Sequence, residues 1–298
     1  MTTAITGTGA EPAAVRTAAP ERRRRIRVPH AGATVAAALL VLLALAAVWP
    51  GLFATHAPHA VDPISALRGP SGSHLLGTDE LGRDVFSRLV HGTRLSLLLG
   101  LGATALAAVT GILLGVLAAT SPRAVDEAIM RVNDVLLAFP GLLLALLVVA
   151  TLGPGTRNAT IAIGLSMTPG FIRLARAQAL TVRNADYVTA SLGLGVRPSA
   201  VYRRHLLPNA MPPVLVFATL NVGTAILSGS ALSFLGLGPQ PPTPEWGAML
   251  AEGRNYLDAA WTAAVCPGLL ITLTVAAIHV LGGAARARVE GTGPRGTH

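Results

Sequence analysis

The feature that most constrains this chain is a series of six long apolar runs separated by shorter polar segments. An apolar helix of about 20 residues crosses the roughly 30 Å hydrocarbon core of a bilayer. Charged residues make up only 12% of the 298 residues, well below the share that is usual in soluble domains. These observations predict an all-α integral membrane protein, a six-span helical bundle with spans near residues 33–53, 95–120, 129–152, 158–177, 211–235 and 262–284.

The first run is weaker than the others, because Pro50 and Gly51 interrupt its end. Arginines at 22–25 precede it, so a cleaved signal peptide is the alternative to a first transmembrane anchor over 33–53. We favour the anchor, because five further runs follow and the basic region lies unusually deep in the chain for a signal peptide.

The composition excludes several kinds of enzyme. All 23 basic residues are arginines, and the chain contains no lysine. A Walker A nucleotide site needs a lysine at the phosphates, and a pyridoxal enzyme needs a Schiff-base lysine. The single cysteine, Cys266, excludes an internal disulfide and a cysteine-based zinc site. The chain therefore cannot be its own P-loop ATPase. We predict a non-catalytic chain with no cofactor or metal of its own.

The distribution of arginines predicts the orientation of the chain. With the N-terminus inside, 17 arginines fall on the cytoplasmic side and six on the outer side, whereas the 14 acidic residues are split evenly. This positive-inside bias supports two cytoplasmic termini, and it explains the net charge of +9 without a nucleic acid partner. Trp49, Trp246 and Trp261 then fall near the outer interface, where such rings anchor. Residues 1–32 are predicted to be a disordered basic tail, and residues 286–298 a second cytoplasmic tail.

The middles of the six runs contain almost no ionisable residues. Ion-coupled transporters normally bury such groups, so the energy for active transport would have to come from another subunit. Arg131 and Asp134 are three residues apart in the third run, and we expect them to pair on one helix face. We expect Pro140 to kink that run, and Gly111 and Gly115 to mark a close helix-packing face.

The most informative segment is the polar stretch over residues 183–209, which is too polar to cross a membrane. Asp186 suits the first turn of one helix, while Pro198 and Pro208 mark the start and end of a second. We predict a helical hairpin within a cytoplasmic loop over 181–208 that docks into a groove on a partner protein, with an ordinary arginine-rich loop as the alternative. One face at helical spacing contains Tyr187, Ala190, Ser191 and Leu194, and the turn contains Gly193 and Gly195.

An outer loop predicted over 54–94 ends in a segment, residues 78–94, that has apolar residues at helical spacing. Thr78 is suited to cap a helix and two acidic residues follow it, so we expect an interfacial helix along the membrane. This helix would act as a gate or as a contact for a binding protein, or it would only anchor the second span. Its candidate residues are Asp79, Gly82, Arg83 and Asp84.

The stretch over 183–209 resembles the EAA loop of binding-protein-dependent ABC importer permeases. Thr189-Ala190-Ser191 stands at the Glu-Ala-Ala positions, Gly195 at the fixed glycine and Leu207-Pro208 at the closing pair. Other segments resemble the dipeptide/oligopeptide/nickel branch, in particular the subunit type with the GTDELGRD segment at 77–84, and the similarity covers about residues 74–284. The chain departs from the family pattern at two positions. Thr189 replaces the Glu of the Glu-Ala-Ala triplet, and Gly229 stands where relatives often have Glu.

This resemblance implies a type I ABC importer permease in the bacterial cell membrane, with a five-span core over 95–285. It implies a homologous second permease, two ABC ATPase subunits that use the ATP, and an extracytoplasmic solute-binding protein. Peptides are the implied solute, with nickel chelates or opines as alternatives. An autonomous channel, a secondary transporter or a membrane scaffold remain rival functions. The implied coupling residues are Asp186, Tyr187, Ala190, Ser191, Gly195, Leu207 and Pro208.

Overall fold

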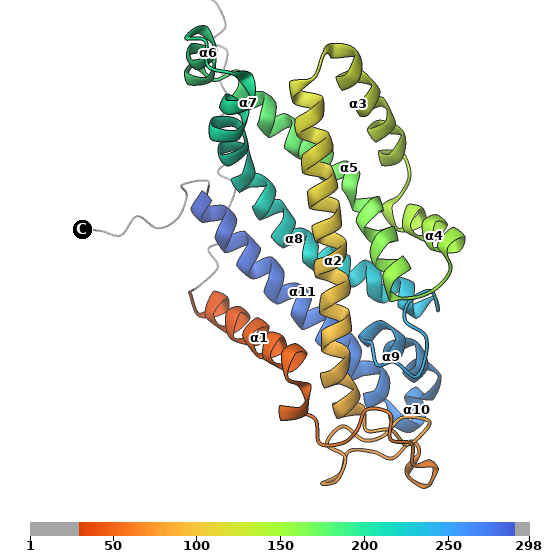
Figure 1. Cartoon of the computed structure of the whole chain (residues 1–298). Helices are drawn as coiled ribbons and strands as arrows, with labels where there is room; N and C mark the ends of the chain where they lie inside the picture. The colour runs from red at the N-terminus through yellow and green to blue at the C-terminus, as the bar shows by residue number, and fades with distance from the viewer. Residues whose placement is uncertain (1–29, 290–298) are drawn as a thin grey trace, which may run out of the picture.

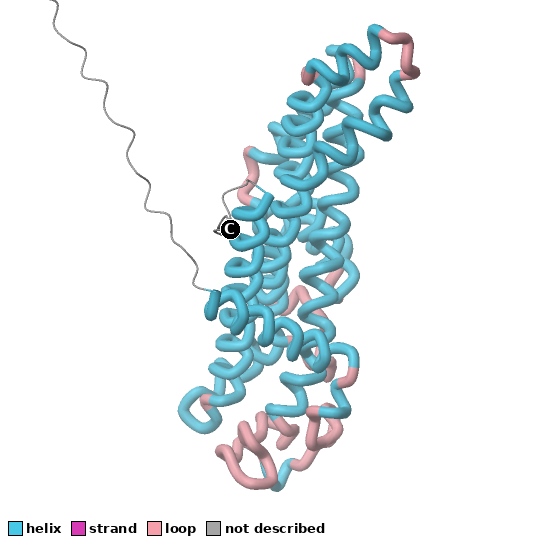
Figure 2. The backbone as a smooth tube through the Cα atoms, turned by 90° about the vertical axis from the view of Figure 1, so that its left-hand side faces the viewer, coloured by secondary structure: helices cyan, strands magenta, loops and turns pink. Residues whose placement is uncertain are grey.

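A computed structural model describes residues 30–289 of the chain, so residues 1–29 and 290–298, most of each predicted tail, lie outside this range. Within it, five long helices run along an elongated bundle, and the loops gather mainly at its two ends (Figures 1 and 2). The described residues form no β-strand, and Thr78 and Asp84 make a single isolated bridge. The long helices are α1 (His30–Val48), α2 (Val85–Thr120), α5 (Thr156–Arg183), α8 (Leu207–Phe234) and α11 (Thr262–Val289).

Shorter elements connect the long helices. The first half of the chain adds α3 (Arg123–Leu137), α4 (Gly141–Leu152) and the single turns η1 (Pro50–Leu52) and η2 (Pro63–Ser65). The second half adds α6 (Asp186–Gly193), α7 (Pro198–Val201), the π-helical segment η3 (Tyr202–Leu206), α9 (Trp246–Gly253), η4 (Arg254–Tyr256) and α10 (Leu257–Ala260).

The all-α membrane fold is confirmed, but the count of six spans is not. Between residues 30 and 289, four helices are long and apolar enough to cross a membrane, or five if α3 and α4 together form one span. The predicted fourth span lies in α5, which is 28 residues long but contains Arg173 and Arg176 within the predicted limits. These arginines lower its apolar character below that of α2, α8 and α11.

The predicted third span is broken rather than kinked. α3 and α4 meet at an angle of 93°, and Pro140 lies directly before α4. The proline cannot donate a backbone hydrogen bond, so the chain changes direction there. Asp134 of α3 lies toward α5, where it accepts a hydrogen bond from Arg173 at 2.8 Å. The expected pairing of Asp134 with Arg131 on one helix was therefore wrong.

Glycines allow α2 and α5 to lie in close contact along the centre of the bundle. A side chain at Gly111 would collide with Phe171, and one at Gly115 would lie 2.7 Å from the carbonyl oxygen of Ile172. The prediction that Gly111 and Gly115 mark a packing face is confirmed.

The predicted interfacial helix over 78–94 is wrong. α2 begins only at Val85, and Asp84, not Thr78, caps it by accepting a hydrogen bond from the Ser87 N–H at 2.8 Å. Gly82 before it has a φ of +73°, which interrupts helical geometry. Residues 85–94 instead form the first turns of a helix that continues without a break to Thr120.

Pro208 does not end the second helix of the predicted hairpin. The helix continues from Pro198 through η3 into α8 and reaches Phe234. In η3 the Leu207 N–H donates to the Tyr202 carbonyl five residues earlier. This wider turn accommodates a proline without breaking the helix.

Candidate functional site

The α6–α7 tip, defined as residues 186–201, projects from one end of the bundle (Figure 1). The structure brings all the predicted coupling residues to this tip and to the helix just after it. All of them are exposed except Ser191, which is half-buried. Leu194, an apolar side chain at the turn, is 85% exposed. The tip therefore presents small side chains together with the exposed side chains of Tyr187, Leu194 and Val196.

Local sequence explains the turn between α6 and α7. Gly195 has a φ of +83°, in the left-handed region that favours glycine. The Val196 N–H donates to the Ser191 carbonyl at 3.2 Å, and the Leu194 N–H donates to the Ala190 carbonyl at 3.0 Å. This pattern is a Schellman-type end of α6. Pro198 then opens α7 at the first helical position, as predicted.

The tip rests on a buried base. Val188, Val201 and Leu206 are fully buried, and Leu206 packs with Ala119 of α2 and Ala179 of α5. The ring of Tyr187 lies edge-on to that of His205, with 6.0 Å between centroids. A tip whose base is packed against two long helices can transmit a displacement to the bundle.

The other end of the bundle contains a network of buried arginines, which we call the Arg83–Arg88 network. Arg83 and Arg88 are each only 1% exposed. Both donate to the same oxygen of Glu252 in α9, at 3.1 and 3.0 Å. Arg83 also pairs with Asp79 at 2.6 Å and with Glu80 at 2.9 Å. The network joins the start of α2 to α9.

Asp79 and Gly82, two of the residues predicted for the gate, determine the shape of the loop that holds this network. The Asp79 carboxylate accepts from the N–H groups of Leu81 and Arg83 at 3.0 and 2.9 Å, which closes a tight turn. A side chain at Gly82 would collide with the backbone of Asp62. Their roles in the structure are therefore local geometry and charge pairing, while a role as gate stays a prediction.

Sequence reasoning missed two acidic residues of this end. Glu252 lies 169 residues from Arg83 along the chain, so no local spacing indicates the pair. Burial raises the pKa of Glu252, although Arg88 and Arg83 oppose that shift. Glu245 is 1% exposed and caps α9 by accepting from the N–H groups of Gly247 and Ala248 at 3.0 and 2.9 Å. A glutamate directly before the first residue of a short helix was the available signal.

The expectation that all three tryptophans anchor at a membrane interface was wrong for Trp246. Its side chain is fully buried, and its Nε1–H donates to the carbonyl of Leu89 at 3.1 Å. Trp49 and Trp261 are 57% and 55% exposed. Trp246 therefore fixes α9 against α2 instead of facing lipid.

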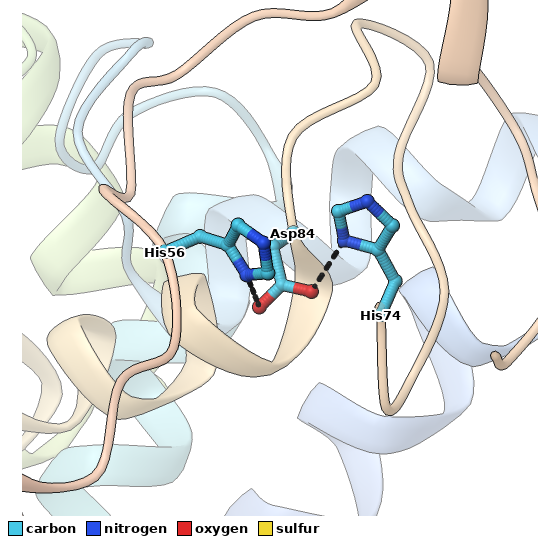
Figure 3. A group of neighbouring side chains, drawn as sticks. All are labelled: His56, His74 and Asp84. Atoms are coloured by element: carbon cyan, nitrogen blue, oxygen red, sulfur yellow. Dashed lines mark hydrogen bonds and ion pairs between the residues drawn. The ribbon is translucent and has the colours of Figure 1, made fainter. Parts of the chain in front are cut away.

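Two clusters have metal-ligating side chains close together. Asp79, Glu80 and Glu252 form the first, and their carboxylates already neutralise Arg83 and Arg88. The second contains His56, His74 and Asp84, and no arginine among the described residues pairs with this carboxylate (Figure 3). Within the described residues, the α6–α7 tip is thus an exposed surface at one end of the bundle, and the opposite end contains buried ion pairs and a histidine cluster.

A helical membrane bundle with an exposed helix pair at one end has the architecture of a transport permease. The family described as binding-protein-dependent transport system inner membrane component matches residues 111–290. The chain is 51% identical over 220 residues to the di/tripeptide transport system permease protein DppC of Pseudomonas aeruginosa, which covers 74% of this chain and 73% of that protein. It is 42% identical over 270 residues to the glutathione transport system permease protein GsiD of Pectobacterium atrosepticum, over 90% and 89% of the two chains.

A solved structure of the MetNI methionine ABC transporter in an inward-facing conformation is similar in fold, with a TM-score of 0.56 and 19% identity. The match covers 67% of this chain and 95% of that one. The chain therefore belongs to the binding-protein-dependent transport system inner membrane component family, and it is a multi-pass permease subunit of an ABC importer. The family predicted from the loop at 183–209 is confirmed.

Proposed function

We propose that this chain forms half of the translocation pathway of an ATP-driven importer of short peptides. The observation that carries the proposal is the exposed α6–α7 tip on its buried base, in a chain with permease relatives. Those relatives are named for di- and tripeptide transport and for glutathione transport, and glutathione is itself a short peptide.

In this proposal the α6–α7 tip docks on an ABC ATPase subunit, and a homologous second permease completes the pathway. The chain has no lysine for a Walker A site, so ATP is bound and hydrolysed by the partner. ATP binding favours one arrangement of the ATPase pair, and that preference biases the bundle between inward-open and outward-open states. A solute-binding protein delivers the peptide from outside.

Reconstitution of the complex tests the proposal. This chain, its second permease, the ATPases and the binding protein encoded nearby are placed in proteoliposomes with ATP inside or outside, and uptake of a labelled dipeptide is measured. We expect accumulation only when ATP reaches the ATPases and the binding protein is present. Accumulation by this chain alone would contradict the proposal, and accumulation of a nickel chelate or an opine in place of peptides would contradict the substrate.

A charge placed on the tip tests the docking surface. Ala190 is exposed on α6, so Ala190→Arg is expected to reduce co-purification of the ATPase at least tenfold without unfolding the bundle. Ser73→Arg is the matched control, because it adds the same charge at an exposed position at the other end of the molecule. Equal co-purification in both variants would contradict docking through the tip.

A further inference from the structure

His56, His74 and Asp84 come together at the start of α2, at the end of the bundle opposite the α6–α7 tip (Figures 1 and 3). The Asp84 carboxylate lies between the two imidazoles and faces the Nδ1 atom of each. One carboxylate oxygen is 3.0 Å from Nδ1 of His74, and the other is 3.9 Å from Nδ1 of His56. The rings stack with 4.8 Å between centroids.

The burial of these side chains is graded in a way that suits a ligand site. Asp84 is 1% exposed, whereas the side chains of His74 and His56 are 18% and 39% exposed. The carboxylate is thus held inside, and the two imidazoles lie toward solvent.

The backbone around the cluster is fixed by Ser87. Its hydroxyl oxygen accepts from the N–H groups of Thr55 and His56 at 3.1 and 3.0 Å, and its own N–H donates to Asp84. Ser87 is fully buried in α2. Hydrogen bonds of this kind orient ligand side chains before a metal arrives.

We propose that His56, His74 and Asp84 form a binding site for a divalent transition metal of the Zn²⁺ class. Two imidazole nitrogens and one carboxylate oxygen are the donor set that Zn²⁺ accepts with a fourth position left to water. The three ligand atoms lie within 4.8 Å of one another. Ligands at about 2.0–2.2 Å from one ion are at most about 4 Å apart, so a small rotation of the exposed His56 side chain closes the set.

The proposal differs from the prediction of a chain without a metal, which rested on the single cysteine. A bound metal would also have a structural effect. The metal would join the segment around His56 and the segment around His74 to the residue that caps α2. It would replace the hydrogen bond now made between Nδ1 of His74 and the Asp84 carboxylate, because a metal ion binds each of these atoms through a lone pair.

Titration of the purified full-length chain tests the site. The chain carries an affinity tag without histidine and is held in detergent, and Zn²⁺, Co²⁺ and Mg²⁺ are titrated separately. We expect one Zn²⁺ per chain, a visible absorption band of tetrahedral Co²⁺, and no response to Mg²⁺ at the same concentrations. Bound Zn²⁺ should also raise the unfolding midpoint and protect the loop over 54–77 from proteolysis.

Separate His56→Ala and His74→Ala variants are each expected to weaken Zn²⁺ binding at least tenfold and to abolish the Co²⁺ band. His59→Ala is the matched control, because His59 is an exposed histidine of the same loop outside the cluster, and it should bind as the unchanged chain does. Circular dichroism establishes that all three variants keep their helices. Absence of binding to the unchanged chain, or equal affinity in all variants, would overturn the proposal.

Discussion

Two glycines near the turn of the α6–α7 tip lie two residues apart and have different backbone requirements. Gly193 is the last residue of α6, whereas Gly195 has a φ of +83°. Neither has an atom within 4 Å of the place where a side chain would begin. Any difference between substitutions at these positions therefore reports on the backbone and not on packing.

We expect Gly195→Ala to destabilise the tip by about 1–2 kcal/mol, because a non-glycine residue resists left-handed backbone. Gly193→Ala is expected to stabilise α6 by about 0.5–1 kcal/mol, since alanine favours helix. Hydrogen exchange of the α6 amides measures both. Faster exchange in Gly193→Ala than in Gly195→Ala would disagree with the turn described above.

The Arg83–Arg88 network places two positive charges almost completely out of contact with solvent. Removing one partner of a buried ion pair leaves the others uncompensated, at a cost of about 3–5 kcal/mol. We expect Arg83→Gln to lower the thermal unfolding midpoint of the chain in detergent clearly below that of the unchanged protein.

The matched control for this prediction is Arg123→Gln. Arg123 pairs with Glu127 at 2.6 Å, but their side chains are 92% and 56% exposed. Exposed pairs contribute about 0–1 kcal/mol, so the midpoint should hardly change. Similar midpoints for Arg83→Gln and Arg123→Gln would show that the network does not stabilise this end.

At the scale of helices, the close contact between α2 and α5 depends on glycines, which have no side chain. Gly111→Leu would force a side chain against Phe171, and overpacking of this kind costs about 1–3 kcal/mol or more. We expect a strong loss of monodisperse protein in size-exclusion chromatography. Ala105→Leu makes a comparable increase at an exposed position of the same helix and should leave the yield unchanged.

One result of this comparison would contradict the close contact between α2 and α5. If Gly111→Leu gave the same yield and elution volume as Ala105→Leu, α2 and α5 would not be in close contact at this level of the bundle.

At the scale of the whole molecule, the two ends of the bundle should face opposite sides of the membrane. The chain has a single cysteine, so Cys266→Ala gives a background for new cysteines. Ser73→Cys and Ser199→Cys introduce exposed thiols at the two ends. We expect a membrane-impermeant maleimide to label Ser73→Cys in intact spheroplasts and Ser199→Cys only after lysis. The reverse pattern would contradict the orientation predicted from the arginines.

Features that depend on neighbouring residues in the sequence were predicted correctly. Gly195 and Pro198 indicated the turn of the tip, and Gly111 with Gly115 indicated a packing face; both are present. The start of α2 was misplaced because the turn at Gly82 depends on the backbone of Asp62, which is distant in the sequence.

Other features depend on contacts between distant parts of the chain, which the periodicity of the sequence does not indicate. The partners of Arg83 and Arg88 include Glu252 in a distant helix, and Trp246 is buried because α9 folds back on α2. The apolar content of the third run suggested one span with a kink at Pro140, whereas α3 and α4 meet at 93° and Asp134 of α3 binds Arg173 of α5. Such features follow from the packing of the whole bundle.

The unbroken helical path from Pro198 to Phe234 has a mechanical consequence. Its 37 residues extend about 55 Å, and near its far end Ser230 lies against Gly247 of α9. This continuous helical path connects the α6–α7 tip, the proposed docking surface for an ATPase, with α9, whose Glu252 pairs with both arginines. If docking tilts the tip, this path would carry the tilt to α9, and the displacement there would grow with the length of the helix.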